Sequence, residues 1–215
     1  WLLSLEEKNV CMLNSPSLLL RYHEKLIPFE AVAAGFLKPR ETVPTHIGDS
    51  ASARRFLEGG EYDPAIRKPF LGFAGADVKK FSLRAGDALP KQEALELTQP
   101  FLGQIAKVGD RRVIFLGGKV IGDFVRLPKQ GEFVSNIARG GSAHLVPMNA
   151  RQKEVARRLG AFLKKVGIVF AGADMIGNLV SEVNITSPTG LRSFESVGGP
   201  KLASQIVTYV ERLAQ

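Results

Sequence analysis

Three oxygen-bearing side chains stand close together near the end of the chain, on either side of a Gly-Asn turn. Asp174 precedes Gly177-Asn178, whereas Glu182 and Asn184 follow it. Residues two apart in a strand share one face, and a three-residue turn would also set Asp174 opposite Glu182. Carboxylate and amide oxygens are ligands that Mg²⁺ binds in proteins. The pattern therefore predicts a metal site, with a hairpin that carries ordinary surface acids as the alternative.

Two lysines could meet a phosphate. Lys25 lies in His23-Glu24-Lys25-Leu26, and Lys68 precedes the small-residue segment 71–76. Backbone amides of such a loop approach phosphates closely, and a nearby lysine supplies a point charge. The alternative is a solvated lysine that protects a strand edge.

Other chemistries find little support in the sequence. One cysteine and three scattered histidines cannot form a zinc site, and no nucleophile elbow is present. We expect Cys11 to fill the core within a strand over 10–13. The histidines His23, His46 and His144 are expected to be structural or surface groups.

The net charge is +8, but the basic residues are dispersed in pairs such as Arg54-Arg55 and Lys79-Lys80. This dispersion argues against a nucleic-acid interface and favours a triphosphate or an acidic small molecule. No apolar run approaches the roughly 20 residues of a membrane span. A single cysteine is consistent with a reducing cytoplasm. Because Trp1-Leu2-Leu3 reads as part of a helix, we expect the chain to begin inside a longer protein.

The elements that would position these residues are mostly antiparallel strands with a few helices, an α+β pattern. Gly117-Gly118 predicts a tight hairpin turn, Asn149 a helix cap, and Gly167 a helix end. Segments 71–76 and 128–142 resemble mobile lids. The expected strands are 112–116, 119–127, 168–175 and 179–184, and the expected helices are 149–166 and 199–215, the last with Leu202, Ile206, Val210 and Leu213 on one face.

The segment 174–192 closely resembles the C-terminal signature of prokaryotic glutathione synthetases, with a Glu-x-Asn-x-Thr-Ser-Pro-Thr core. Other blocks agree in order: Asn14-Ser15-Pro16 with 23–26, the stretch 67–75, Gln99-Pro100-Phe101-Leu102, Gly109-Asp110-Arg111-Arg112, Arg126-Leu127-Pro128 and 136–141. The resemblance covers essentially all of this chain but only the later part of the family's chain. A family N-terminal domain, on the order of 120 residues at usual domain size, is not represented.

The resemblance implies an ATP-grasp fold, in which two α+β subdomains clamp the nucleotide. Residues 1–40 would lead into the fold, 41–98 would form the small lid subdomain, and 99–215 the large subdomain with the metal site. The cofactors implied are ATP and Mg²⁺, with Mn²⁺ as an alternative. The implied partners are small molecules, with no nucleic acid and no membrane, and homo-oligomer formation stays open.

The resemblance also assigns roles residue by residue. Asp174, Glu182 and Asn184 would hold the metal. Arg112 would face the transferred phosphoryl group with Asp110 in support, and Arg126 and Asn136 would meet the acceptor substrates. The expected nucleotide contacts are Lys25, Lys68, Gly72, Gly75, Gln99, Phe101, Leu102 and Asp110. The expected substrate contacts are Arg139, Gly140, Gly141, Ser187, Pro188, Thr189 and Arg192.

The implied activity is ATP-dependent ligation of γ-glutamylcysteine to glycine through an acyl phosphate. The chain departs from the family's pattern at Val134, where an arginine is typical, and at Leu71, where an acid is common. Two alternatives therefore stay open: a ligase for another carboxylate–amine pair, and a nucleotide-binding module without catalysis.

Overall fold

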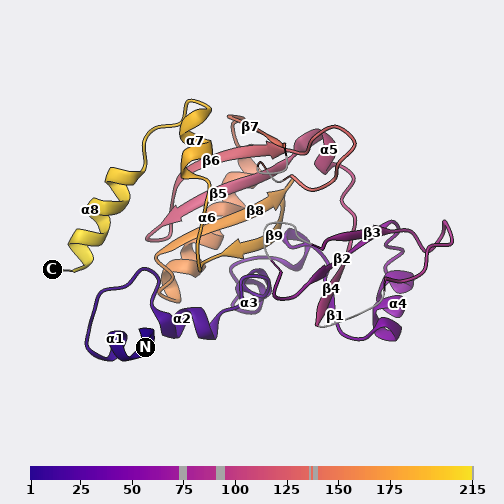
Figure 1. The fold of residues 1–215 in the computed structure, drawn as a ribbon, viewed down its shortest axis with the longest axis horizontal. Helices are drawn as coiled ribbons and strands as arrows, with labels where there is room; N and C mark the ends of the chain where they lie inside the picture. The colour runs from indigo at the N-terminus through magenta and orange to yellow at the C-terminus, as the bar shows by residue number, and fades with distance from the viewer. Residues whose placement is uncertain (73–76, 91–94, 136, 138–139, 215) are drawn as a thin grey trace.

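The computed structural model describes residues 1–72, 77–90, 95–135, 137 and 140–214. Its strands form two antiparallel sheets, of four and five strands (Figure 1). The smaller sheet has the order β1 (His46–Ile47), β4 (Glu96–Pro100), β2 (Ala65–Pro69) and β3 (Lys79–Phe81). Its apolar side packs Ala65 and Phe81 against Leu57 of α4 (Ser50–Gly59). An Asp49 side chain caps α4 by accepting from the amide of Ser52.

The larger sheet has the order β7 (Ser142–His144), β6 (Lys119–Leu127), β5 (Asp110–Leu116), β8 (Phe170–Ile176) and β9 (Leu179–Asn184). The predicted hairpin is confirmed: β5 and β6 pair across Gly117-Gly118, and both glycines have positive φ, at 57° and 77°. The predicted strands around the Gly-Asn turn are confirmed as β8 and β9.

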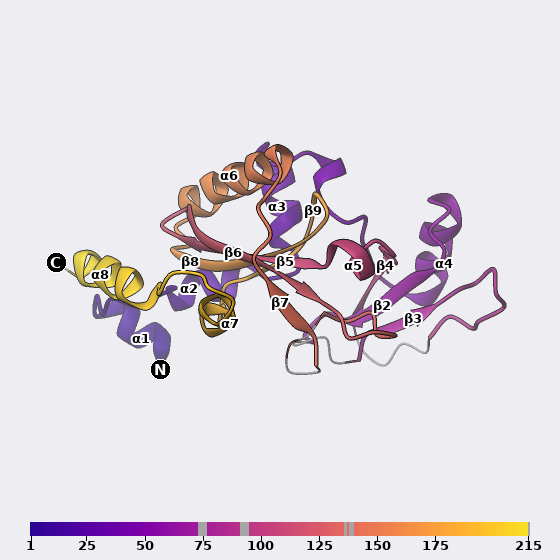
Figure 2. The ribbon, with the colours of Figure 1, turned by 90° about the horizontal axis from the view of Figure 1, so that it is seen from above.

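Helices cover both faces of the larger sheet (Figure 2). On one face lies α6 (Ala150–Lys165), together with α3 (Ile27–Ala33). On the other lies α7 (Leu191–Ser196). Side chains alternate along β5. Val113 and Phe115 therefore belong to the apolar cluster between the sheet and α6, here called the α6 core, while Ile114 belongs to the cluster between the sheet and α7, the α7 core. This two-sided burial explains the apolar run 113–116 within β5.

The predicted cap of α6 is confirmed. Asn149 accepts from the amide of Gln152 at 2.8 Å, and the Gln152 side chain accepts from the amide of Asn149 at 3.0 Å. This reciprocal pair satisfies two amides at the start of the helix. The helix is thereby fixed at the end that lies near the β8–β9 turn, where Gln152 also donates to the carbonyl of Gly177.

Two expectations near the termini were wrong. Residues 10–13 form no strand, and Cys11 is exposed rather than buried. The closing helix, α8 (Ala203–Leu213), is shorter than expected and buries none of its residues. Leu202 is buried just before the helix, whereas Leu213 is 46% exposed. The apolar residues of α8 are spaced along one face as predicted, but only those at its start pack against the α7 core.

The remaining elements are short: α1 (Leu2–Glu7), α2 (Pro16–Arg21), the 3-10 helix η1 (Pro39–Glu41) and α5 (Ile105–Val108). Strand β4, which ends at Pro100, still belongs to the smaller sheet, and α5 connects it to the larger one. The division into two subdomains stays a proposal. In the structure the chain passes from the smaller to the larger sheet between residues 100 and 110. None of the helices in the described part of the chain is long and apolar enough to cross a membrane.

Candidate active site

The β8–β9 hairpin brings Asp174 and Glu182 together by a route that differs from the expected one. Its turn has two residues, not three, because Ile176 pairs with Leu179 and Met175 with Val180. The register then shifts, so that Asp174 pairs with Glu182 and Ser181 is the extra residue of a β-bulge. The Ser181 hydroxyl donates to the carbonyl of Asp174 at 3.1 Å.

Asp174 is the centre of an ion-pair cluster at the larger sheet. Arg112 binds it through two nitrogens, with Nε 2.6 Å from Oδ1 and a terminal nitrogen 3.1 Å from Oδ2. Arg126 lies 2.8 Å from Oδ1. Burial alone would favour the neutral acid, but the two guanidinium groups outweigh it and hold the pKa of Asp174 below its usual value. Asp174 is therefore a carboxylate.

Asp110 shares Arg126 with Asp174. It forms an ion pair with Arg126, its direct partner across the β5–β6 ladder. The Asp110 side chain is 17% exposed. Burial, together with the negative charge of Asp174, outweighs the attraction of Arg126 and raises the pKa of Asp110 to about 6.

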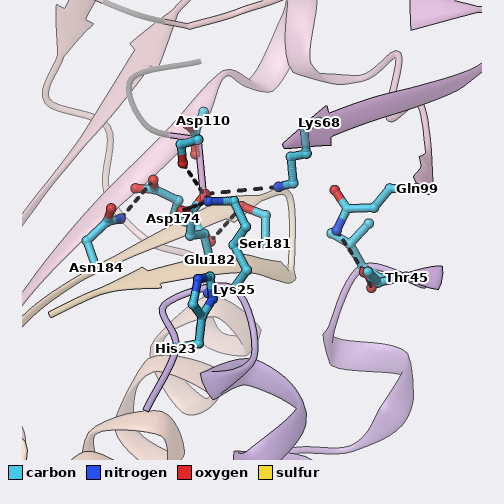
Figure 3. A network of polar contacts seen from close by, with 12 residues as sticks. His23, Lys25, Thr45, Lys68, Gln99, Asp110, Asp174, Ser181, Glu182 and Asn184 are labelled. Carbon is cyan, nitrogen blue, oxygen red and sulfur yellow. Dashed lines mark hydrogen bonds and ion pairs between the residues drawn. The ribbon is translucent and has the colours of Figure 1, made fainter. Parts of the chain in front are cut away.

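The two lysines both meet Glu182 (Figure 3). Lys25 Nζ lies 3.4 Å from Glu182 Oε1 and donates to the carbonyl of Gly72 at 2.6 Å. Lys68 Nζ lies 4.0 Å from Glu182 Oε2. Burial lowers the pKa of Lys68, and the positive charge of Lys25 adds to this effect, whereas Glu182 opposes it. Cations from two distant segments thus converge on one carboxylate.

Asp174, Glu182 and Asn184 carry oxygens of the kind that a hard divalent cation binds, and the strands bring these side chains near one another. The metal site itself stays a prediction. Asn184 Nδ2 lies 3.4 Å from Asp174 Oδ2, and Glu182 stands directly across from Asp174. The described residues contain no cluster of three His, Cys, Asp or Glu side chains that could hold a metal, so this set depends on the amide of Asn184. Mg²⁺ accepts such a mixed set, completed by substrate oxygens and water.

A pocket of about 640 Å³ opens beside this cluster. Lys25, Lys68, Asp110, Arg112, Arg126, Asp174, Glu182 and Asn184 line its charged side. Gly72, Gln99, Phe101 and Leu102 line it as well, so the expected nucleotide contacts among the described residues reach one cavity. The Gln99 side chain donates to Thr45 Oγ1 at 2.7 Å, which adds Thr45 to the surroundings of the pocket.

The expected substrate contacts are only partly brought together. Ser187 and Thr189 line the pocket, and Arg112 donates to the carbonyl of Thr189 at 2.9 Å. Arg192 is exposed. It does not line this pocket, and neither do Gly140, Gly141 and Pro188. Gly75, Asn136 and Arg139 lie outside the described residues, as do parts of both expected lid segments.

Two residues beside Lys25 were missed as parts of the site. The His23 ring stacks on Phe70, with 3.8 Å between ring centroids, and burial lowers the pKa of His23. Glu24 accepts two backbone hydrogen bonds from the segment after β9. Both residues line the pocket. Their adjacency to Lys25 was visible in the sequence, but their partners are distant along the chain.

Comparisons with known proteins find related sequences and a shared fold. The family model described as "Prokaryotic glutathione synthetase, ATP-grasp domain" matches residues 39–199. A glutathione synthetase of Prochlorococcus marinus is 33% identical over 213 residues, covering 94% of this chain and 65% of its own length. One of Synechocystis sp. is 33% identical over 211 residues, covering 94% and 62%. The chain thus spans about two thirds or less of these curated relatives.

Solved structures show the same fold. The ATP-grasp ligase PsnB, in a complex with a precursor variant, Mg and ADP, superposes with a TM-score of 0.71 at 19% identity, covering all of this chain and 66% of PsnB. The D-alanine–D-alanine ligase of Bacillus anthracis, in complex with ATP, gives a TM-score of 0.61 at 17% identity, covering 99% and 74%.

Proposed function

The chain belongs to the ATP-grasp domain family of prokaryotic glutathione synthetases, and on this premise we propose that it binds Mg-ATP and joins a carboxylate to an amine. The observation that carries the proposal is the convergence of Lys25 and Lys68 on Glu182, beside Asp174, at one wall of the 640 Å³ pocket. Phosphate-binding cations and metal-binding carboxylates are both required for phosphoryl transfer.

In the proposed reaction the substrate carboxylate attacks the γ-phosphate of ATP, and ADP leaves. An amine then attacks the resulting acyl phosphate, and phosphate leaves. Lys25 and Lys68 would bind phosphate oxygens, while Arg112 and Arg126 hold Asp174 in place and present positive charge to the transferred group. Asp174, Glu182 and Asn184 would hold Mg²⁺, or Mn²⁺ in its place, which neutralises charge on the phosphates.

The nucleotide base would lie against the hinge formed by the end of β4. Gln99, Phe101 and Leu102 line that part of the pocket. Phe101 is held from two sides: Phe133 meets it edge-on, with 6.0 Å between centroids, and Lys80 lies 3.9 Å from its ring centre. A ring fixed in this way offers a firm apolar surface for a flat base.

We propose γ-glutamylcysteine and glycine as the substrates, by analogy with the glutathione synthetases that the chain resembles. Thr186, Ser187 and Thr189 offer hydroxyl groups at the pocket wall. A second candidate is another carboxylate–amine pair, because Phe133 and Val134 line the pocket without supplying charge for an additional carboxylate. We propose that the reaction takes place in the cytoplasm, with small molecules as the partners.

The test is ADP release by the purified 215-residue chain with Mg-ATP and one carboxylate–amine pair at a time. We expect turnover when γ-glutamylcysteine and glycine are both present, and no turnover when either is supplied alone. Turnover with a different pair would overturn the proposed substrates while supporting a ligase. Calorimetric binding of Mg-ATP without turnover on any pair would favour a nucleotide-binding module, and absence of binding would overturn the nucleotide site.

A further inference from the structure

The segment that follows β9 is tied to the N-terminal part of the chain by side chains. Ile185 donates its amide to Glu24 Oε1 at 2.9 Å, and Thr186 donates to the same oxygen at 2.9 Å. The Ile185 carbonyl accepts from Asn14 Nδ2 at 2.8 Å. Since β9 is an edge strand of the larger sheet, these contacts satisfy backbone groups that have no neighbouring strand.

The other end of this segment, at Thr189, is bound by an arginine of the ion-pair cluster. Arg112, which binds Asp174 through two nitrogens, also donates to the carbonyl of Thr189. Residues 185–189, named here the acceptor loop, are therefore fixed at both ends. Three of them, Thr186, Ser187 and Thr189, line the pocket.

Glu24 and Lys25 act on two different parts of the pocket. The carboxylate of Glu24 binds the start of the acceptor loop, whereas Lys25 Nζ reaches Glu182 and the carbonyl of Gly72. The backbone between them is itself bound to the sheet, because the amide of Val183 donates to the carbonyl of Glu24 at 3.1 Å. Two neighbouring residues thus hold the acceptor loop and the nucleotide lysine in a fixed relation.

We propose that Glu24 is a positioning residue that sets the acceptor loop against the nucleotide site, so that it governs the use of the acceptor substrates and not the affinity for nucleotide. The proposal rests on the function proposed above. A carboxylate that accepts two adjacent amides forms charge-assisted hydrogen bonds, and its removal leaves both amides without a partner. The loop would then sample positions in which its hydroxyl groups no longer face the substrate.

The experiment compares Glu24→Ala and Glu24→Gln with wild type, and uses Glu30→Ala as the matched control because Glu30 is exposed in the same part of the chain. Hydrogen exchange of the amides of Ile185 and Thr186 should speed up on the order of tenfold in Glu24→Ala. The KM values for γ-glutamylcysteine and glycine should rise by a similar factor, while the calorimetric Kd for Mg-ATP stays within about twofold of wild type.

Glu24→Gln should recover part of both effects, because a glutamine oxygen can still accept from the two amides. Unchanged exchange at Ile185 and Thr186 in Glu24→Ala would overturn the proposal. A parallel loss of stability, ATP affinity and acceptor use would also overturn it, since that pattern indicates a purely structural role. Lack of turnover in wild type with these substrates would contradict the proposed substrates, and amide exchange would still decide the role of Glu24.

Discussion

The ammonium group of Lys25 lies 3.4 Å from Oε1 of Glu182, and the two side chains are 6% and 21% exposed. A cation proposed to bind phosphate is therefore neutralised by a carboxylate proposed to bind metal. Lys68 approaches the other oxygen of the same carboxylate. Nucleotide without metal must compete with Glu182 for both lysines, so the two ligands should bind with positive coupling.

Glu182→Gln should abolish turnover and yet strengthen the binding of ATP in the presence of EDTA, on the order of tenfold. The variant removes a metal ligand, but it also removes the negative charge that occupies both lysines. Isothermal titration calorimetry with and without Mg²⁺ measures this difference. Glu211→Gln, at an exposed position of α8, is the control. Weaker metal-free binding in Glu182→Gln would show that the ion pairs do not compete with nucleotide.

Lys68→Ala should weaken Mg-ATP binding by about tenfold or more, since it removes a charge that is largely screened from water. Lys79→Ala, an exposed lysine on the neighbouring strand β3, should leave the affinity unchanged. The measurement is calorimetric at saturating Mg²⁺. Equal affinities of wild type and Lys68→Ala would exclude a phosphate contact at this position.

Asp110 should make stability depend on pH in the absence of ligands. Its pKa is raised from 3.8 to about 6, so between these values the folded protein holds a proton that the unfolded chain has released. The free energy of unfolding should therefore decrease as pH rises through this window. Asp110→Asn, which stays neutral, should show a flatter profile in urea denaturation from about pH 4 to 8. Identical profiles for the two proteins would contradict the assignment.

Gly160→Ala should lower the free energy of unfolding by about 1–3 kcal/mol or more. A Cβ at Gly160 would lie 2.2 Å from the carbonyl oxygen of Gly118, because α6 packs directly on the β5–β6 turn. Gly59→Ala in α4 meets nothing within 4 Å and should be neutral or stabilising by up to about 1 kcal/mol. Thermal and urea denaturation provide the comparison, and equal effects of the two substitutions would contradict this packing.

The sequence by itself determined the elements whose signals are local. Gly117-Gly118 predicts a hairpin because only residues that tolerate positive φ suit such a turn, and Asn149 predicts a helix start because its side chain can cap free amides. The Glu-x-Asn-x-Thr-Ser-Pro-Thr core within 174–192, together with the order of the other blocks, was sufficient to identify the family. The same local rules failed at 10–13, where an apolar run has no partner strand and Cys11 is exposed.

Only the tertiary structure decided which side chains meet. Asp174 faces Glu182 because one extra residue, Ser181, is accommodated as a bulge; without the bulge, a two-residue turn would place Glu182 on the other face of the sheet. Glu24 contacts Ile185 across 161 positions of the chain. A contact over that distance depends on how edge strands and buried charges find partners in the folded molecule, and no local spacing encodes it.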